Sequence, residues 1–278
     1  MNLLVVELRR AVHRRIVRWM LLLAVALCVV AGIVAFAASG DFDETSRNPT
    51  TYIDGMEHTD PDIARLSDLW REDAPDSSVL TPLLLFLAVG AFVCGASVVG
   101  AEWKAGTIVT TLTWEPRRVR LLVARLAACG IWATVLTLAL IGVFVLAILP
   151  NALVNGDTSG LDGEWWAGFL GMSARIAVIG GLAATFGAAI ASLGRNTTAA
   201  IVVIFAYFMV AENMVRGLWP RWQNFLIGES VPRFVTATPL EGVDRYTRST
   251  LGAVVLISAY VVILSGAAAF AFARRDVT

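Results

Sequence analysis

Few side chains in this sequence could take part in catalysis. The chain has two histidines, His13 and His58, and one lysine, Lys104. The lysine does not stand in the G-x-x-x-x-G-K-[ST] pattern of a phosphate-binding loop. The two histidines are predicted to lie on opposite sides of a membrane, so a shared zinc site or a histidine-based triad is not expected. We therefore predict that the chain is not an enzyme and holds no metal or cofactor of its own.

The composition is that of a membrane protein. Apolar residues make up 57% of the 278 residues, charged residues make up 16%, and the mean hydropathy is +0.71. Soluble domains carry about 25% charged residues, so the composition excludes a soluble enzyme, a disordered chain and a small disulfide scaffold. Six apolar runs have about the length of a helix that crosses a ~30 Å hydrocarbon core. They are residues 20–39, 80–99, 127–149, 167–193, 198–215 and 251–273.

Arginine is concentrated in alternate segments between these runs. It precedes the first run, lies between the second and third and between the fourth and fifth, and follows the sixth. The loop 40–79 instead carries 11 acidic residues and 3 arginines. The positive-inside rule then places both termini in the cytoplasm. A cleaved signal peptide is the alternative for the first run, but its core of about 18 residues exceeds the usual 7–15.

Three segments outside the runs are predicted to be ordered. Residues 1–19 carry an apolar stripe opposite several arginines, as in a helix that lies on the membrane surface, although a basic flank that only sets topology would look similar. The acidic loop 40–79 is expected to cap the outer side and to contain a short helix near residues 61–71. A binding role for this loop is the alternative. Residues 216–250 are too apolar for a solvated loop. Breaks at Pro220, Pro232 and Pro239 predict short helices that dip into the outer leaflet.

The fourth run contains rows of small residues at helical spacing. Such rows allow two helices to approach closely. We expect close packing within the chain or with a second chain, and a lining for a substrate path is the alternative. The residues are Gly180, Gly181, Ala184 and Ala188.

The segment 100–126 is predicted to form a short helix of its own on the cytoplasmic side. Gly106 would break the second spanning helix, and Thr107 would cap a new helix that carries Ile108 and Leu112. This helix has no evident apolar use within its own chain. It could therefore bind a partner protein or rest on lipid.

A second helix is predicted to start at Pro116 and to continue into the third run, because proline is favoured in the first turn of a helix. Arg117 and Arg118 would stand in that first turn, where the helix dipole disfavours a cation by ~0.3–1 kcal/mol. Lipid phosphate and topology, or an acidic protein partner, would explain their presence.

In these features the chain resembles the permease subunits of type-2 ATP-binding-cassette exporters. That family shows an acidic residue, a Gly-Thr pair, a short helix and a Pro-Arg turn after its second span. The matching positions here are Glu102, Gly106-Thr107, 108–113 and 116–118. Residues 194–197, together with Tyr207 and Glu212 in the fifth run, resemble actinobacterial members.

The resemblance implies an all-α, six-span domain covering residues 1–278 that pairs with a second permease subunit, identical or paralogous, in a bacterial cytoplasmic membrane. ATP and Mg would be bound by a separate ATP-binding-cassette ATPase, and no nucleic-acid partner is implied. The coupling residues would be Glu102, Gly106, Thr107, Ile108, Leu112, Pro116, Arg117 and Arg118. An ion-coupled secondary transporter and a non-transporting scaffold or signalling subunit are the alternatives.

Two charges are predicted inside the membrane. Arg175 in the fourth run and Glu212 in the fifth run lie at similar depths if each helix rises 1.5 Å per residue. They could therefore pair between helices and offset the cost of a charge in lipid. Alternatively, Glu212 could pair with Arg216, four residues later on its own helix.

Overall fold

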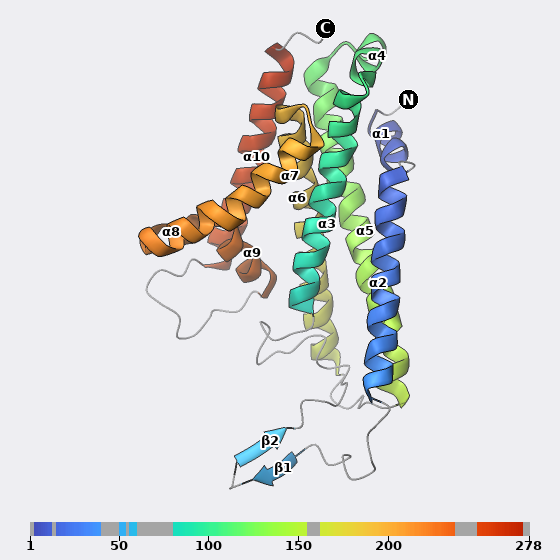
Figure 1. The fold of residues 1–278 in the computed structure, drawn as a ribbon, viewed down its shortest axis with the longest axis vertical. Helices are drawn as coiled ribbons and strands as arrows, with labels where there is room; N and C mark the ends of the chain where they lie inside the picture. Colours follow the sequence, from blue (N-terminus) through green and yellow to red (C-terminus); the bar gives the residue numbers. More distant parts are fainter. Residues whose placement is uncertain are drawn as a thin grey trace.

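Apart from one hairpin, the described chain is helical (Figure 1). The structure is a computed structural model, and it describes seven parts of the chain. They are residues 3–12, 15–39, 50–53, 56–59, 80–154, 162–236 and 249–274. The helix expected near residues 61–71 lies outside these parts, as does Pro239.

Five helical segments are long and apolar enough to cross a membrane. They are Leu83–Lys104, Arg118–Pro150, Gly163–Gly194, Thr197–Leu218 and Thr250–Arg274. The first apolar run lies in helix α2 (Arg15–Ser39), whose described apolar stretch, Val17–Ile33, is shorter than these five. The chain is thus a multi-pass membrane protein with five candidate spans among the described residues, where the sequence predicts six.

The helices extend beyond the apolar runs that predict them. Helices α3 (Leu80–Lys104) and α5 (Arg118–Val154) continue into polar residues, where a hydropathy pattern gives no signal. Helix α6 (Gly163–Gly194) begins at a cap in which the Asp162 carboxylate accepts the Trp165 backbone N–H at 2.8 Å. Helix α10 (Thr250–Arg274) closely matches the sixth run.

Helix α6 packs against α3, α5 and α10 at the centre of the bundle. The approach is close because the contacts are made through small residues. A Cβ on Gly181 would lie 2.8 Å from the Gly130 carbonyl oxygen of α5, and one on Gly180 would meet Thr137 of the same helix. Ala184 is fully buried, and its carbonyl faces Gly95 of α3. Ala188 is fully buried as well.

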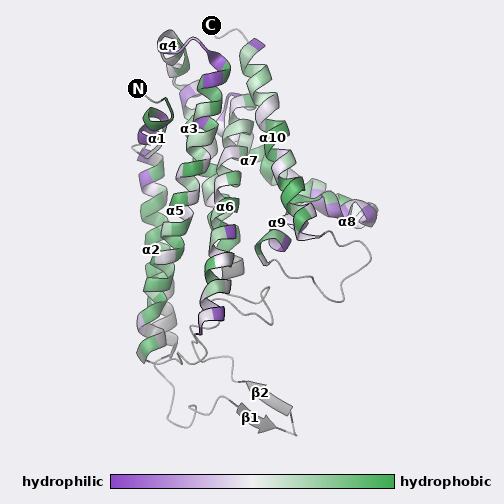
Figure 2. Ribbon diagram, turned by 180° about the vertical axis from the view of Figure 1, so that it is seen from behind, coloured by the Kyte–Doolittle hydropathy of each residue, from purple (hydrophilic) through white to green (hydrophobic). Residues whose placement is uncertain are grey.

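One end of the bundle gathers several chain segments. Helices α1 (Leu3–Val12) and α4 (Thr107–Trp114) lie at this end together with the last turns of α10 (Figures 1 and 2). Trp103 at the end of α3 contacts Phe272 of α10 edge to face, with ring centroids 5.9 Å apart. The Arg195 guanidinium, in the turn after α6, lies 4.9 Å from the Trp103 ring centroid. Hydrophilic residues concentrate here, whereas the middle of α2, α3, α5 and α10 is hydrophobic (Figure 2). We call this the α4 end.

The predicted surface helix over residues 1–19 is wrong in its extent. Helix α1 ends at Val12, and Trp19 belongs to the second helix, α2. Helix α1 packs against α5. Glu7 lies in this contact and is buried, which holds the helix against the bundle.

The acidic loop contains a hairpin that was not expected from the sequence. Strands β1 (Thr50–Ile53) and β2 (Met56–Thr59) pair antiparallel, with Thr50 opposite Thr59 and Ile53 opposite Met56. The described fold is therefore helical with one two-stranded ribbon.

The segment Thr197–Leu218 leans away from the bundle. It consists of α7 (Thr197–Ala206), a π-helical turn η4 (Tyr207–Ala211) and α8 (Glu212–Leu218), which projects sideways in Figure 1. Only 11% of its apolar stretch is buried within the chain, against 67% for α6. Most of its surface is therefore left for lipid or for another protein.

Two short helices follow this leaning segment. They are the 3-10 helix η5 (Pro220–Phe225) and helix α9 (Ile227–Thr236), which packs against α10 and α6. This agrees with the short helices expected in residues 216–250. Pro232 does not break the chain as expected, because it lies inside α9.

Candidate functional site

The turn between α3 and α4 is made by a glycine. Gly106 has φ +68°, a left-handed conformation that side chains with a Cβ rarely adopt. It occupies the cap position of α4, where glycine has no side chain to form a capping hydrogen bond. The sequence predicted Thr107 as the cap of this helix, but Thr107 is its first residue. Pro116 lies in the non-helical residues 115–117, and α5 starts two residues after it.

Helix α4 has a buried side and an exposed side. Ile108 is buried among residues of α3 and α5, and Leu112 packs partly against the same cluster. The expectation that this helix has no apolar use within its own chain is therefore wrong for Ile108. The exposed side carries Val109, 45% exposed, and Trp114, 86% exposed. Trp114, at the tip of this short helix, is the most exposed large hydrophobic side chain among the described residues.

Three charges are buried beneath α4. The Arg125 guanidinium lies 2.6 Å from the Glu102 carboxylate through Nη1 and 3.5 Å from the Glu7 carboxylate through Nε. Only 3% of the Arg125 side chain is exposed. Arg10 also pairs with Glu7, at 3.1 Å, and is more open. We call Glu7, Glu102 and Arg125 the inner charge cluster, and it joins α1, α3 and α5.

The inner charge cluster changes the position expected for Glu102. Glu102 was expected among the residues that couple the chain to a partner ATPase, but it is buried and bound to Arg125. Sequence reasoning treated Arg125 only as one of the arginines that set topology, and it assigned no role to Glu7. One signal was available: Glu7 is the only acid in residues 1–19, and it follows Leu4 by three positions, so it falls on the apolar side of the helix.

Arginines of the next segment line an open groove at the same end. Arg117, Arg118 and Arg120 surround a groove of about 630 Å³ between the start of α5 and the end of α10. Val119, Val123 and Ala273 complete its lining. A cationic rim over apolar side chains suits anionic lipid headgroups as well as an acidic protein surface.

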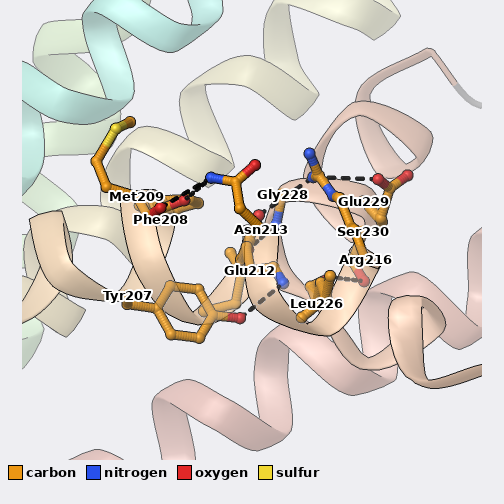
Figure 3. Close-up of polar contacts among 11 residues, drawn as sticks. Tyr207, Phe208, Met209, Glu212, Asn213, Arg216, Leu226, Gly228, Glu229 and Ser230 are labelled. Atoms are coloured by element: carbon orange, nitrogen blue, oxygen red, sulfur yellow. Dashed lines mark hydrogen bonds and ion pairs between the residues drawn. The ribbon is translucent and has the colours of Figure 1, made fainter. Parts of the chain in front are cut away.

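A second group of charges lies where α8 meets α9 (Figure 3). The Glu212 side chain is buried, with 3% exposed, and accepts the Gly228 backbone N–H at 2.8 Å. Arg216 lies 3.2 Å from Glu212 and 3.1 Å from Glu229 of α9. The Tyr207 hydroxyl accepts the Ile227 backbone N–H at 3.2 Å. We call Glu212, Arg216 and Glu229 the outer charge cluster.

The position of Glu212 agrees with the chemistry of a helix terminus. Ile227 and Gly228 open α9, so their N–H groups have no acceptor within that helix. The partial positive charge at a helix N-terminus favours a carboxylate. Glu212 thus joins α8 to α9 while its charge is also paired with Arg216.

The π-helical turn before Glu212 has a side chain that completes its hydrogen bonds. The Asn213 amide donates to the carbonyls of Phe208 and Met209 at 3.1 and 3.0 Å (Figure 3). Single π-turns inside α-helices occur frequently at functional sites. The Glu212 side chain, which follows this turn, reaches the first residues of α9.

The interhelical pair between Arg175 and Glu212 does not form in this structure. The Arg175 Nε donates instead to the Gly171 carbonyl on its own helix, at 3.0 Å. Of the two hypotheses from the sequence, the local pair with Arg216 is the one observed.

No protein-family model matches this chain, and no curated protein is significantly similar to it.

The site residues expected from the sequence therefore do not form a single site. Glu102, Gly106, Thr107, Ile108, Leu112, Pro116, Arg117 and Arg118 lie together at the α4 end. Glu212 lies at the junction of α8 and α9, and Arg175 lies on α6 without contact to it. Within the described ranges, no group of three or more histidine, cysteine or acidic residues is placed to hold a metal ion.

Proposed function

We propose that this chain is the membrane-spanning permease subunit of an ATP-driven exporter, and that α4 couples it to a separate ATP-binding-cassette ATPase. The observation that carries the proposal is the form of α4. It is a short helix set off by a left-handed glycine, with an exposed tryptophan on one side and a buried isoleucine on the other. A partner bound to the exposed side could displace such a helix, and the buried side chain would transmit the displacement to the bundle.

Ile108 would transmit such a displacement. This side chain is buried in a cluster shared by α3, α5, α6 and α10. The inner charge cluster lies in the same region and ties α1 to α3 and α5. A displacement of α4 would therefore move several spanning helices together, as alternating access requires.

The proposal includes six spans and cytoplasmic termini. Helix α2 would be the sixth span, because it is helical over 25 residues and packs along α5. The α4 end would face the cytoplasm, since it carries Lys104, Arg117, Arg118, Arg120 and Arg274 near the ends of spanning helices. The host membrane would be that of a bacterium.

A second permease subunit is part of the proposal. The leaning segment Thr197–Leu218 buries little of its apolar surface within the chain. A second copy or a paralogue that packs against this segment would enclose a path between the two subunits. Native mass spectrometry in mild detergent would give two permease chains per particle, and a single-permease particle would contradict this part of the proposal.

Co-purification tests the coupling. The tagged chain, extracted in mild detergent from its own host, should carry a stoichiometric ATPase with a phosphate-binding loop. Val109→Asp and Trp114→Asp place a charge on the exposed side of α4 and should release that ATPase. Val5→Asp is the control, because Val5 on α1 is 58% exposed at the same end of the bundle and lies outside both α4 and the arginine-lined groove. It should retain the ATPase.

Two results would refute the proposal. Transport that is driven by an ion gradient alone, with no ATPase bound, would indicate an ion-coupled secondary transporter. A bound ATPase without any transport in proteoliposomes would indicate a scaffold or signalling subunit. A third result would refute only the role of α4: release of the ATPase by Val5→Asp and not by Val109→Asp would place the contact on α1.

A further inference from the structure

The arginine-lined groove of the α4 end combines a cationic rim with apolar walls. It lies between the start of α5 and the end of α10, and its lining consists of Arg117, Arg118, Val119, Arg120, Val123 and Ala273. We propose that this groove binds an anionic phospholipid, with the phosphate at the arginines and the acyl chains along the apolar surfaces of α5 and α10.

The groove lies at the ends of two candidate spans. The segment Arg118–Pro150 begins at the groove, and the segment Thr250–Arg274 ends beside it. The Arg274 guanidinium lies 4.2 Å from the ring centroid of Phe270, which is 58% exposed. A cation together with an exposed aromatic ring at the end of a span is typical of the membrane interface. The groove is therefore at the depth of the lipid headgroups.

The surroundings of the groove are positive over a short and over a longer range. Next to the three lining arginines, Arg274 follows Ala273, and Glu115 precedes Arg117 by two positions. Four arginines thus accompany one glutamate, and the two charged residues that follow Arg274 in the sequence are of opposite sign and lie outside the described parts. Among the described residues of the α4 end, the other acids are the two carboxylates of the inner charge cluster, which already pair with arginine. The groove therefore favours an anion.

The order of the side chains favours a lipid over an acidic protein surface. Val119 and Val123 are four positions apart, so they lie on one side of α5, and Val123 is one turn further into the span. They are 47% and 53% exposed. A cationic turn followed by an aliphatic turn matches the order of phosphate and acyl chain in a phospholipid. An acidic side chain of a soluble partner would pair with the arginines but would provide no hydrocarbon to cover Val123.

The helix terminus at the groove also suits a phosphate. The first turn of an α-helix has backbone N–H groups without an acceptor in the helix, and its partial positive charge favours an anion. The same charge disfavours arginine, yet Arg118 and Arg120 stand in the first turn of α5. A bound phosphate would offset this repulsion, because it attracts both the arginines and the helix terminus.

Two phospholipids with the same acyl chains and different headgroups test the proposal. Dioctanoyl phosphatidylglycerol and dioctanoyl phosphatidylcholine would be titrated onto the delipidated full chain in a nonionic detergent, and native mass spectrometry would count the bound lipids. We expect the first phosphatidylglycerol to bind at least about five-fold more tightly than the first phosphatidylcholine, the factor for one arginine near an anionic lipid. Equal affinities would overturn the proposal.

Inorganic phosphate separates a lipid site from a phosphate site. We expect no loss of bound phosphatidylglycerol when inorganic phosphate is added at the same concentration, because phosphate lacks the acyl chains that cover the apolar walls. Displacement of the lipid under this condition would show that the groove binds phosphate alone, and the assignment to a lipid would fail.

Variants locate the binding site. Arg117→Gln and Arg120→Gln each remove one cation from the groove, so each should lower the affinity for phosphatidylglycerol about five-fold. Arg9→Gln is the matched control, since Arg9 is an exposed arginine of α1 at the same end and does not line the groove. It removes the same charge and should leave the affinity unchanged. Equal losses for Arg9→Gln and Arg120→Gln would indicate attraction to the whole surface and contradict the assignment.

The co-purification experiment separates a lipid from a protein partner. Arg120→Gln should retain the ATPase while its affinity for phosphatidylglycerol falls. Release of the ATPase with unchanged lipid affinity would mean that the groove contacts an acidic protein surface, and it would overturn the proposal. Lipid binding is measured on the chain alone, without ATP or an ATPase, so this inference stands or falls separately from the proposed exporter function.

Discussion

The inner and outer charge clusters are built from the same residue types and differ in access to solvent. In the inner charge cluster, one arginine that is 3% exposed lies between two buried carboxylates on different helices. In the outer charge cluster, an arginine that is 42% exposed joins one buried carboxylate to one that is 37% exposed. Removing one partner from a fully buried group leaves an uncompensated charge, whereas an open pair is replaced by water at little cost.

This difference suggests different mechanical roles. The inner charge cluster fixes three helices in one arrangement, as suits elements that must move together. The outer charge cluster is a junction whose exposed partners can exchange with water. Four experiments test this contrast, beginning with the largest expected effect.

Arg125→Met should destabilise the protein most. It removes the buried guanidinium that pairs with Glu102 and leaves Glu7 paired with Arg10 only, and we expect a loss of about 3–5 kcal/mol. Unfolding of the purified protein in mixed detergent and sodium dodecyl sulfate measures this. Arg120→Met changes an exposed arginine on the same helix and should cost less than about 0.5 kcal/mol. Similar losses for the two variants would remove the distinction between the clusters.

Glu212→Leu should have the next largest effect. It removes the acceptor of the Gly228 N–H and the partner of Arg216, and we expect a loss of about 1–3 kcal/mol. Glu212→Gln keeps an acceptor for the amide, so its loss should be about half as large. The same unfolding measurement applies, and a glutamine variant as unstable as the leucine variant would show that charge, and not the hydrogen bond, dominates.

A double-mutant cycle gives a smaller effect. Leucine substitutions of Glu212 and Arg216 should couple by about 0.5–1 kcal/mol, because they share an ion pair on one helix. Leucine substitutions of Glu212 and Arg175 should be additive, because Arg175 bonds to the Gly171 carbonyl instead. Coupling between Glu212 and Arg175 would indicate a second conformation in which the interhelical pair forms.

Salt should give the smallest effect. Raising the ionic strength from about 0.05 to 0.5 M shortens the screening length and should weaken the coupling of Arg216 with Glu229 by a few tenths of a kcal/mol. The coupling of Arg125 with Glu102 is buried and should not change. A salt response of equal size at both clusters would show that water reaches Arg125.

The sequence predicted the elements that depend on local composition. Continuous apolar runs identified every long helix, and the small residues of the fourth run mark the close approach of α6 to α3 and α5. Gly106 was expected to interrupt the chain, and it does so with φ +68°. Each of these features is encoded within about 20 consecutive residues.

Features that depend on contacts between distant residues were missed or misplaced. Glu7 and Arg125 lie 118 positions apart, and nothing local in either segment specifies the other. Burial of Ile108 likewise depends on how α4 folds back over the bundle. Trp219 and Trp222 line one groove with Tyr207 and Tyr260, which come from other segments, although in the sequence these tryptophans look like ordinary interfacial anchors.

The π-turn has a consequence for comparing this chain with homologues. Each residue of an α-helix turns the next by about 100°, so the five-residue π-turn Tyr207–Ala211 acts as a one-residue insertion that rotates everything after it. A homologue one residue shorter in this turn would carry a regular helix, and its acid equivalent to Glu212 would point away from α9. A gap of one residue in an alignment here would therefore mark the loss of the junction with α9, even where every charged residue is conserved.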